Sequence, residues 1–341
     1  MSYRGIFRCV ALSAIAALGL VAQAAAQDNA NHNPNHYPNR PITLVVPFPP
    51  GGSTSIVGRI VADKMSELLG QQIVVENRGG AGGTVGTRGV AKSPADGYTL
   101  ILGYTGTLAI GPSLYGYNNV GYDPRKDFAP IGQIGTAPNT LVVHPSFEVK
   151  SVAELVAYAK ANPGKVNFGS AGVGTVSHIC GEYFATEAGI KLTHIPYKGT
   201  GPALTDLLGG HIPMAFAPIP AVHEQAKNGN LRMLAVTSAQ RSTLMPDVPT
   251  IAEAGLTGFE AVLRYGLAAP AGTPRPVIDR LNKVLNQALA MDEMRKRLAI
   301  EGAEPIPSTP EEYGVAIDRE ERTWAKVLKA AGVKADEPRS Q

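Results

Sequence analysis

Glycine, serine and threonine residues gather at the points where the sequence predicts that strands end and helices begin. The first of these junctions is VVPFPPGGSTS, residues 45–55, in which three prolines stiffen the loop before Gly51 and Gly52. The two glycines let a ligand approach the backbone, and Ser53–Ser55 can cap the next helix or donate hydrogen bonds. Free amide groups at a helix start attract anions, so this junction is predicted to bind an anion, although an ordinary capped turn has the same residues.

A second junction has a similar composition. The segment NFGSAGVGTVSH, residues 167–178, places Ser170, Gly172, Gly174 and Thr175 around a predicted helix start. It lacks the last glycine of the dinucleotide fingerprint, and no acidic residue closes a strand about 20 residues later, so nucleotide binding is not favoured. The histidine that ends the segment has two interpretations, a general base or a hydrogen-bonding and packing residue.

Other candidates follow neighbouring strands. The glycine-rich segment 73–86 lacks the spacing of a phosphate loop and is predicted to be a tight structural turn, with Thr84 facing the same cleft. Tyr104 and Thr105 come directly after another predicted strand. These residues are therefore expected near the first two junctions, because ligands bind outside the carboxyl ends of strands in open α/β sheets.

The last junction carries a positive charge. Lys198, Gly199 and Thr200 precede a helix predicted over residues 203–208. The lysine either pairs with an anionic ligand or belongs to a solvated face, and the sequence leaves both interpretations open.

The junctions as a group are poorly suited to catalysis. The predicted strand ends carry no pair of carboxylates, no Gly-x-Ser-x-Gly elbow, no His-Glu-x-x-His and no cysteine cluster. Neutral hydrogen-bond donors suit reversible capture, so we predict a binding protein that is not an enzyme and uses no cofactor and no metal. The alternative is a secreted α/β hydrolase-like enzyme that uses His178 as its base.

The elements that position these residues form an α/β pattern, because short β-branched runs alternate with helix-length amphipathic segments from Pro41 onward. Two helix starts carry capping-box residues, Ser151 with Glu154 and Thr309 with Glu312. Strands are predicted at residues 42–46, 73–76, 99–102, 140–143, 166–169, 194–195, 214–216, 231–236 and 265–269.

The first residues indicate export. Two arginines precede an apolar run over residues 9–22 that ends in small residues, as in a secretory signal peptide cleaved near Ala24 or Ala26. An Asn- and Pro-rich segment, residues 27–39, is expected to be a flexible leader. The predicted location is therefore the periplasm.

Composition narrows the function further. The 341 residues are 44% hydrophobic, which is enough for sizeable cores, and the net charge is only +3 without a run of like charges. No nucleic acid partner is expected. After cleavage Cys180 would be the one remaining cysteine, and it is predicted to be buried filler.

The motifs of the chain resemble those of one family, the substrate-binding receptors of tripartite tricarboxylate transporters, also called the Bug family of extracytoplasmic solute receptors. The resemblance spans nearly all of the predicted mature chain. It is carried by RPITLVVPFPPGGST (40–54), VVENRGGAGGTVG (74–86), SPADGYTL (93–100), SAGVGTVSH (170–178), HIPYKGTGPALTDLLGG (194–210), LAVTSAQR (234–241), PDVPTIAEAG (246–255) and APAGTP (269–274).

The resemblance implies a two-lobed periplasmic-binding-protein fold of type II, a hinged clamp in which lobe one is discontinuous. The expected divisions are a signal peptide (1–26), a leader (27–39), lobe one (40–140 and 265–333), lobe two (141–264) and a tail (334–341). It also implies a monomer that captures a small carboxylate, such as a dicarboxylate or an aromatic acid, for integral-membrane transporter subunits. A ligand-sensing subunit of a sensor kinase would have the same cleft.

In this family the ligand is gripped between the loop at residues 48–55 and the second-lobe loops at 170–178 and 198–200. Three positions depart from the family pattern. Ser55 and Ala217 often have aspartate counterparts, and Arg264 stands where an aromatic residue is common. Arg264 would either hold a second carboxylate or pack its stem on the sheet edge. The predicted ligand-binding residues are Phe48, Gly51, Gly52, Ser53, Thr54, Ser55, Thr84, Tyr104, Thr105, Ser170, Gly172, Gly174, Thr175, His178, Lys198, Gly199, Thr200, Ala217 and Arg264.

Overall fold

The computed structural model describes residues 37–48, 50 and 53–333. Contacts divide the chain into residues 1–39 and 40–341, and the fold given below is that of the second unit. The predicted signal peptide, most of the predicted leader and the predicted tail lie outside the described residues. In the part of the chain that is described, no helix has the length and apolar character needed to cross a bilayer.

Ten strands form one mixed sheet, in the order β2-β1-β3-β9-β4-β7-β5-β6, with β8 and β10 each paired to β4. Parallel pairs flank β1, whereas β9 runs antiparallel to both β3 and β4. The strands are β1 (Ile42–Val46), β2 (Ile73–Asn77), β3 (Thr99–Tyr104), β4 (Phe128–Val143), β5 (Asn167–Ser170), β6 (Thr193–Pro196), β7 (Met214–Pro218), β8 (Arg232–Val236), β9 (Val262–Pro270) and β10 (Glu304–Pro305).

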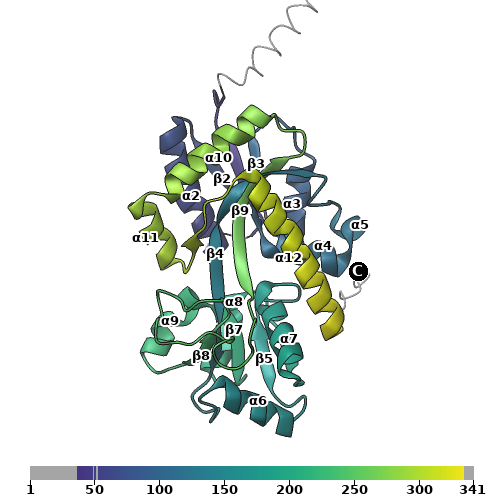
Figure 1. Cartoon of the computed structure of the whole chain (residues 1–341), viewed down its shortest axis with the longest axis vertical. Helices are drawn as coiled ribbons and strands as arrows, with labels where there is room; N and C mark the ends of the chain where they lie inside the picture. Colours follow the sequence, from purple (N-terminus) through teal and green to yellow (C-terminus); the bar gives the residue numbers. More distant parts are fainter. Residues whose placement is uncertain (1–36, 49, 51–52, 334–341) are drawn as a thin grey trace, which may run out of the picture. The chain divides into compact units, whose positions relative to one another are not determined.

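The long strand β4 joins two lobes. Residues 128–138 of β4 pair with β9, and residues 139–143 pair with β7 and β8. Lobe one holds β1, β2, β3 and β10, and lobe two holds β5 to β8, so the chain leaves lobe one along β4 and returns along β9 (Figure 1). The two-lobed α/β architecture with a discontinuous lobe one is confirmed.

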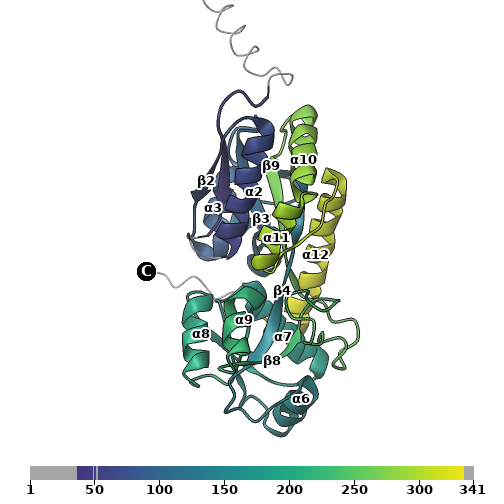
Figure 2. The same cartoon turned by 90° about the vertical axis from the view of Figure 1, so that its left-hand side faces the viewer.

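Helices cover both faces of each lobe. In Figure 1, α2, α10 and α11 lie to one side of the upper strands, and α3 and α12 lie to the other. Figure 2 shows the same layers after a rotation of 90° about the vertical axis. The helices are α2 (Ser53–Leu69), α3 (Thr84–Ala91), α4 (Gly111–Tyr115), α5 (Tyr117–Val120), α6 (Val152–Ala161), α7 (Val176–Ala188), α8 (Thr200–Leu208), α9 (Ile219–Lys227), α10 (Arg275–Leu289), α11 (Asp292–Ile300) and α12 (Pro310–Ala331).

Strand alternation explains the two cores of lobe two. Met214 and Phe216 of β7 pack in the cluster that contains α6 and α7, whereas Ala215 and Ala217 pack in the cluster with α8 and α9. Successive side chains of a strand point to opposite faces, so one short strand supplies both cores. Ala217 therefore lies in an apolar core, where a ligand-binding role had been predicted.

The predicted helix caps are confirmed in one case and half formed in the other. Thr309 and Glu312 make a full capping box at the start of α12. At α6, Ser151 accepts the N–H of Glu154, but the Glu154 carboxylate accepts the N–H of Lys150 instead of that of Ser151.

Helix α12 reaches both lobes. Tyr313 near its start packs against Leu108 of lobe one, and Trp324 near its end packs in the core of lobe two that contains α7. The helix therefore runs alongside the strands that connect the lobes, as Figure 1 shows.

Candidate functional site

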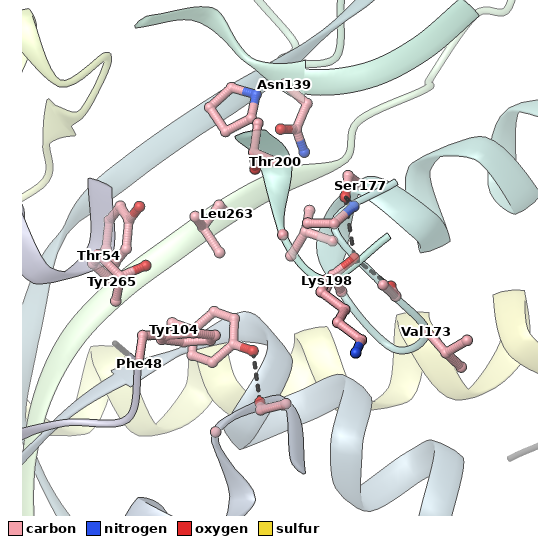
Figure 3. A pocket seen from close by; sticks show the side chains of 18 of the residues that line it. Phe48, Thr54, Tyr104, Asn139, Val173, Ser177, Lys198, Thr200, Leu263 and Tyr265 are labelled. Atoms are coloured by element: carbon pink, nitrogen blue, oxygen red, sulfur yellow. Dashed lines mark hydrogen bonds between the residues drawn. The ribbon is translucent and has the colours of Figure 1, made fainter. Parts of the chain in front are cut away.

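A cavity of about 490 Å³ opens between the lobes, where β1, β3, β5 and β7 end. In Figure 3, Phe48, Thr54, Tyr104 and Tyr265 lie on one side of it and Val173, Ser177 and Lys198 on the other. The lining residues are Phe48, Pro50, Thr54, Gly80, Gly82, Gly83, Tyr104, Asn139, Ala171, Gly172, Val173, Thr175, Val176, Ser177, Lys198, Gly199, Thr200, Pro218, Leu263 and Tyr265.

The wall from lobe one is aromatic. The rings of Phe48 and Tyr104 meet edge to face with centroids 4.8 Å apart. The hydroxyl of Tyr104 donates to the carbonyl of Gly82 at 3.0 Å, and burial raises the pKa of this phenol far above its usual value. The phenol is therefore a fixed neutral group that ties β3 to the loop after β2.

The first predicted junction contributes only in part. Of its predicted ligand-binding residues, Phe48 and Thr54 line the cavity. Ser55 does not, because its buried hydroxyl accepts a hydrogen bond from the side chain of Asn77 at 3.0 Å. Gly51 and Gly52 lie outside the described residues, and of Ser53 only the backbone is described, at the start of α2.

The loop after β2 was predicted to be a structural turn, but Gly80, Gly82 and Gly83 line the cavity. Gly83 has a φ of 93°, and a Cβ there would lie 3.1 Å from the carbonyl oxygen of Pro47. The position therefore requires glycine, which the spacing of the motif did not indicate. Thr84 does not line the cavity, because its hydroxyl turns back to donate to Ala81.

The second junction lines the cavity mainly with backbone and apolar side chains, because its hydroxyl groups already have hydrogen-bond partners. Thr175 caps α7 and also donates to the carbonyl of Gly172 at 2.6 Å, and Ser177 accepts the N–H of Ala171 at 3.0 Å. Gly172 lines the cavity, whereas Gly174 does not. The hydroxyls of this loop are therefore engaged within the loop itself.

Two predicted site residues, Ser170 and His178, lie behind this loop and not in the cavity wall. His178 is 4% exposed and its ring stacks on that of His194, with centroids 3.9 Å apart. The hydroxyl of Ser170 lies 2.6 Å from Nε2 of His194. Burial first, and the neighbouring His178 second, lower the pKa of His194 to about 3.

The depressed pKa of His194 predicts an acid-sensitive fold. The unfolded chain takes up a proton on this ring near pH 6.5, whereas the folded protein does so only near pH 3, so the contribution to stability is present above pH 6.5 and is lost as the pH falls toward 3. Urea unfolding between neutral pH and about pH 4 should show a shallower decline for His194→Phe than for the wild type. Equal slopes would contradict this assignment, because all other titrating groups are shared by the two proteins.

The lobe-two junction at α8 is the one that carries charge. Lys198, Gly199 and Thr200 all line the cavity, and no other charged side chain of the described residues does. Neither Lys198 nor Thr200 makes a side-chain hydrogen bond or ion pair with another described residue. Gly199 precedes α8 with a φ of 127° and supplies no side-chain cap, so the first amides of α8 are left to other partners.

Of the two interpretations of Arg264, the one in which its side chain points into the cleft does not agree with the structure. Its neighbours Leu263 and Tyr265 line the cavity, so strand alternation turns Arg264 to the opposite face of β9. There its Nε lies 2.7 Å from the carboxylate of Glu320. Thr105 is also outside the cavity wall, because its hydroxyl donates to Glu320 and accepts the backbone N–H of Arg264.

Several lining residues were not predicted. Asn139 lies where β4 changes partners, and its amide group is 3.7 Å from the sulfur of buried Cys180. Leu263, Tyr265 and Pro218 line the cavity from β9 and β7. No local motif marks these positions; only the pairing of distant strands brings them to the cavity.

Residues 57–333 of this chain match the family model of the tripartite tricarboxylate transporter family receptor. The chain belongs to this receptor family. BugT of Bordetella pertussis is 42% identical over 296 residues, which cover 86% of this chain and 90% of BugT. A family of solute receptors is not a family of enzymes, so the hydrolase alternative is set aside, in agreement with the place of His178 behind the loop.

Solved structures that are similar to this chain in sequence have the same fold. R. palustris Rpa4515 with adipate matches with a TM-score of 0.80 and 39% identity, covering 87% of this chain and 98% of that chain. MatC from Rhodopseudomonas palustris with bound malate matches with a TM-score of 0.76 and 33% identity, covering 86% and 100% respectively. The predicted type II periplasmic-binding-protein fold is thereby confirmed.

Proposed function

We propose that this receptor captures a small carboxylate in the interlobe cavity and delivers it to integral-membrane subunits of a tripartite transporter. The observation that carries the proposal is Lys198, an unpaired cation in a cavity wall that has no other charged side chain among the described residues. Adipate and malate in the two related structures support the same ligand class.

The carboxylate would bind at the start of α8. The ammonium group of Lys198, the hydroxyl of Thr200 and the first amides of α8 are available there, and an anion is stabilised by such a helix start. The rest of the ligand would lie against Phe48, Tyr104 and the other apolar residues of the lobe-one wall. A carboxylate on an aliphatic chain or an aromatic ring fits this division.

The proposal extends to the organisation of the chain. Lobe one would comprise residues 40–140 and 265–333, and lobe two residues 141–264, with the ligand closing one on the other. The protein would be exported by its signal peptide and act in the periplasm as a monomer. The membership of a transporter receptor family supports delivery to a transporter more than to a sensor kinase.

A thermal-shift panel on the secreted form tests the ligand class. Adipate, malate and benzoate are compared with neutral adipamide and with cationic cadaverine, each at several concentrations. A carboxylate at 100 times its Kd should stabilise the protein by about 2.7 kcal/mol, and the two controls should not. A shift with cadaverine, or none with a wider set of mono- and dicarboxylates, would contradict the proposal.

A further inference from the structure

One of the loops that form the lobe-two wall, residues 170–177, rests on two stacked histidines that do not line the cavity. His178 comes from α7 and His194 from β6, and their rings are nearly parallel at 20°. The other side of His194 stacks on Phe168 of β5, with centroids 4.9 Å apart. The three rings form a column directly behind the loop, in which Phe168 and His178 are buried and His194 is half-buried.

Each histidine holds a different part of the loop. Nδ1 of His178 accepts the N–H of Gly174 at 3.2 Å. This bond requires an unprotonated Nδ1, so the ring proton is on Nε2, which lies 3.7 Å from Oε1 of Glu182. Nε2 of His194 contacts the hydroxyl of Ser170, and that hydroxyl accepts the N–H of Gly172 at 3.1 Å.

The remaining inward bonds complete the loop. The N–H of Ala171 is taken by Ser177 and that of Thr175 by the carbonyl of Gly172. No such partner is present within the described chain for the N–H groups of Val173, Val176 and Ser177, and all three residues line the cavity. The network therefore satisfies the other amides of the loop and leaves these three for another partner.

The backbone of the loop requires glycine at two positions. Gly172 has a φ of 127° and Gly174 a φ of 75°, conformations that residues with a side chain rarely adopt. A Cβ at Gly174 would lie 3.3 Å from Leu114 and Tyr115 of α4, so lobe one also limits the space available to the loop.

We infer that His178 and His194 are positioning residues for the ligand: they set the shape of the 170–177 loop by accepting or sharing its inward hydrogen bonds, and do not touch the ligand themselves. The inference rests on the proposed carboxylate binding for its functional consequence. The inference requires that His178 act as a hydrogen-bond acceptor, and not only as a side chain that fills space behind the loop.

Three variants distinguish these roles. His178→Asn keeps an acceptor at the place of Nδ1 but loses the ring, whereas His178→Phe keeps a stacked ring but loses the acceptor. The control is His144→Phe, because Nδ1 of His144 accepts the N–H of Ser146 at 3.2 Å in a loop that does not line the cavity. Amide exchange of residues 171–177, thermal stability and affinity are measured for each protein. The affinity probe is adipate, malate or benzoate, whichever the wild type binds most tightly.

His178→Phe is expected to speed exchange at Gly174 and to weaken probe binding by about tenfold or more, because the half-buried amide of Gly174 loses its acceptor. In His178→Asn the exchange rate at Gly174 and the affinity for the probe should stay close to those of the wild type. His144→Phe should change neither quantity. Wild-type affinity in His178→Phe, or equal losses in the Phe and Asn variants, would overturn the inference. If the wild type binds no carboxylate, the proposed function fails, and unchanged exchange at Gly174 in His178→Phe would still overturn the positioning role by itself.

Discussion

Replacing Arg264 by methionine is expected to lower the free energy of unfolding by about 3–5 kcal/mol, because the carboxylate of Glu320 then stays buried without its cationic partner. The two side chains are 10% and 12% exposed and 2.7 Å apart. Thr105, the other partner of Glu320, is neutral and cannot compensate the charge. The pair joins β9 to α12 beside the strands that connect the lobes. Its loss should therefore lower the stability of both lobes and not only that of one segment.

Urea unfolding measures this loss, and two further variants test its cause. The double variant Arg264→Met with Glu320→Met should recover most of the stability, because the unpaired charge is removed. Arg275→Met removes an arginine from exposed pairs with Asp279 and Glu311 and should change stability little. A stable Arg264→Met protein that has lost carboxylate binding would contradict the structural role and return Arg264 to the binding site.

Replacing Lys198 by glutamine is expected to weaken carboxylate binding by roughly ten- to a hundredfold, the range that corresponds to the loss of one charge-assisted hydrogen bond. The side chain is exposed and unpaired with any described residue, so the melting temperature of the ligand-free protein should not change. Calorimetric titration with the acid that gives the largest thermal shift measures the effect.

The matched control for this variant is Lys191→Gln, because Lys191 is an exposed lysine of the same lobe that does not line the cavity. Its affinity for the same acid should equal that of the wild type. If both variants bind like the wild type, Lys198 belongs to a solvated face and the anion is held by other groups. If both weaken equally, the effect is long-range attraction and not a contact.

The family resemblance and the α/β pattern together predicted most of the architecture. Residues 42–46 form β1 with the predicted bounds, and Thr309 with Glu312 starts α12 as predicted. These features depend on alternation and capping within a few residues, so the local sequence is sufficient for them. The strand predicted over residues 140–143 begins at Phe128 instead, because glycines and prolines interrupt its β-branched pattern while pairing with β9 holds it extended.

The sequence by itself determined which junctions surround the cavity: the loops around Thr54, Thr175 and Lys198 all line it, because strand ends of one sheet converge wherever the sheet is built. Which side chains of those loops face the cavity was decided only by tertiary structure. A shift of one residue in β9 reverses the direction of Arg264, and its partner Glu320 lies 56 residues later. His178 likewise turns inward because a second histidine, 16 positions further along the chain, offers it a ring to stack on. Contacts between distant segments fix these orientations, and no local pattern encodes them.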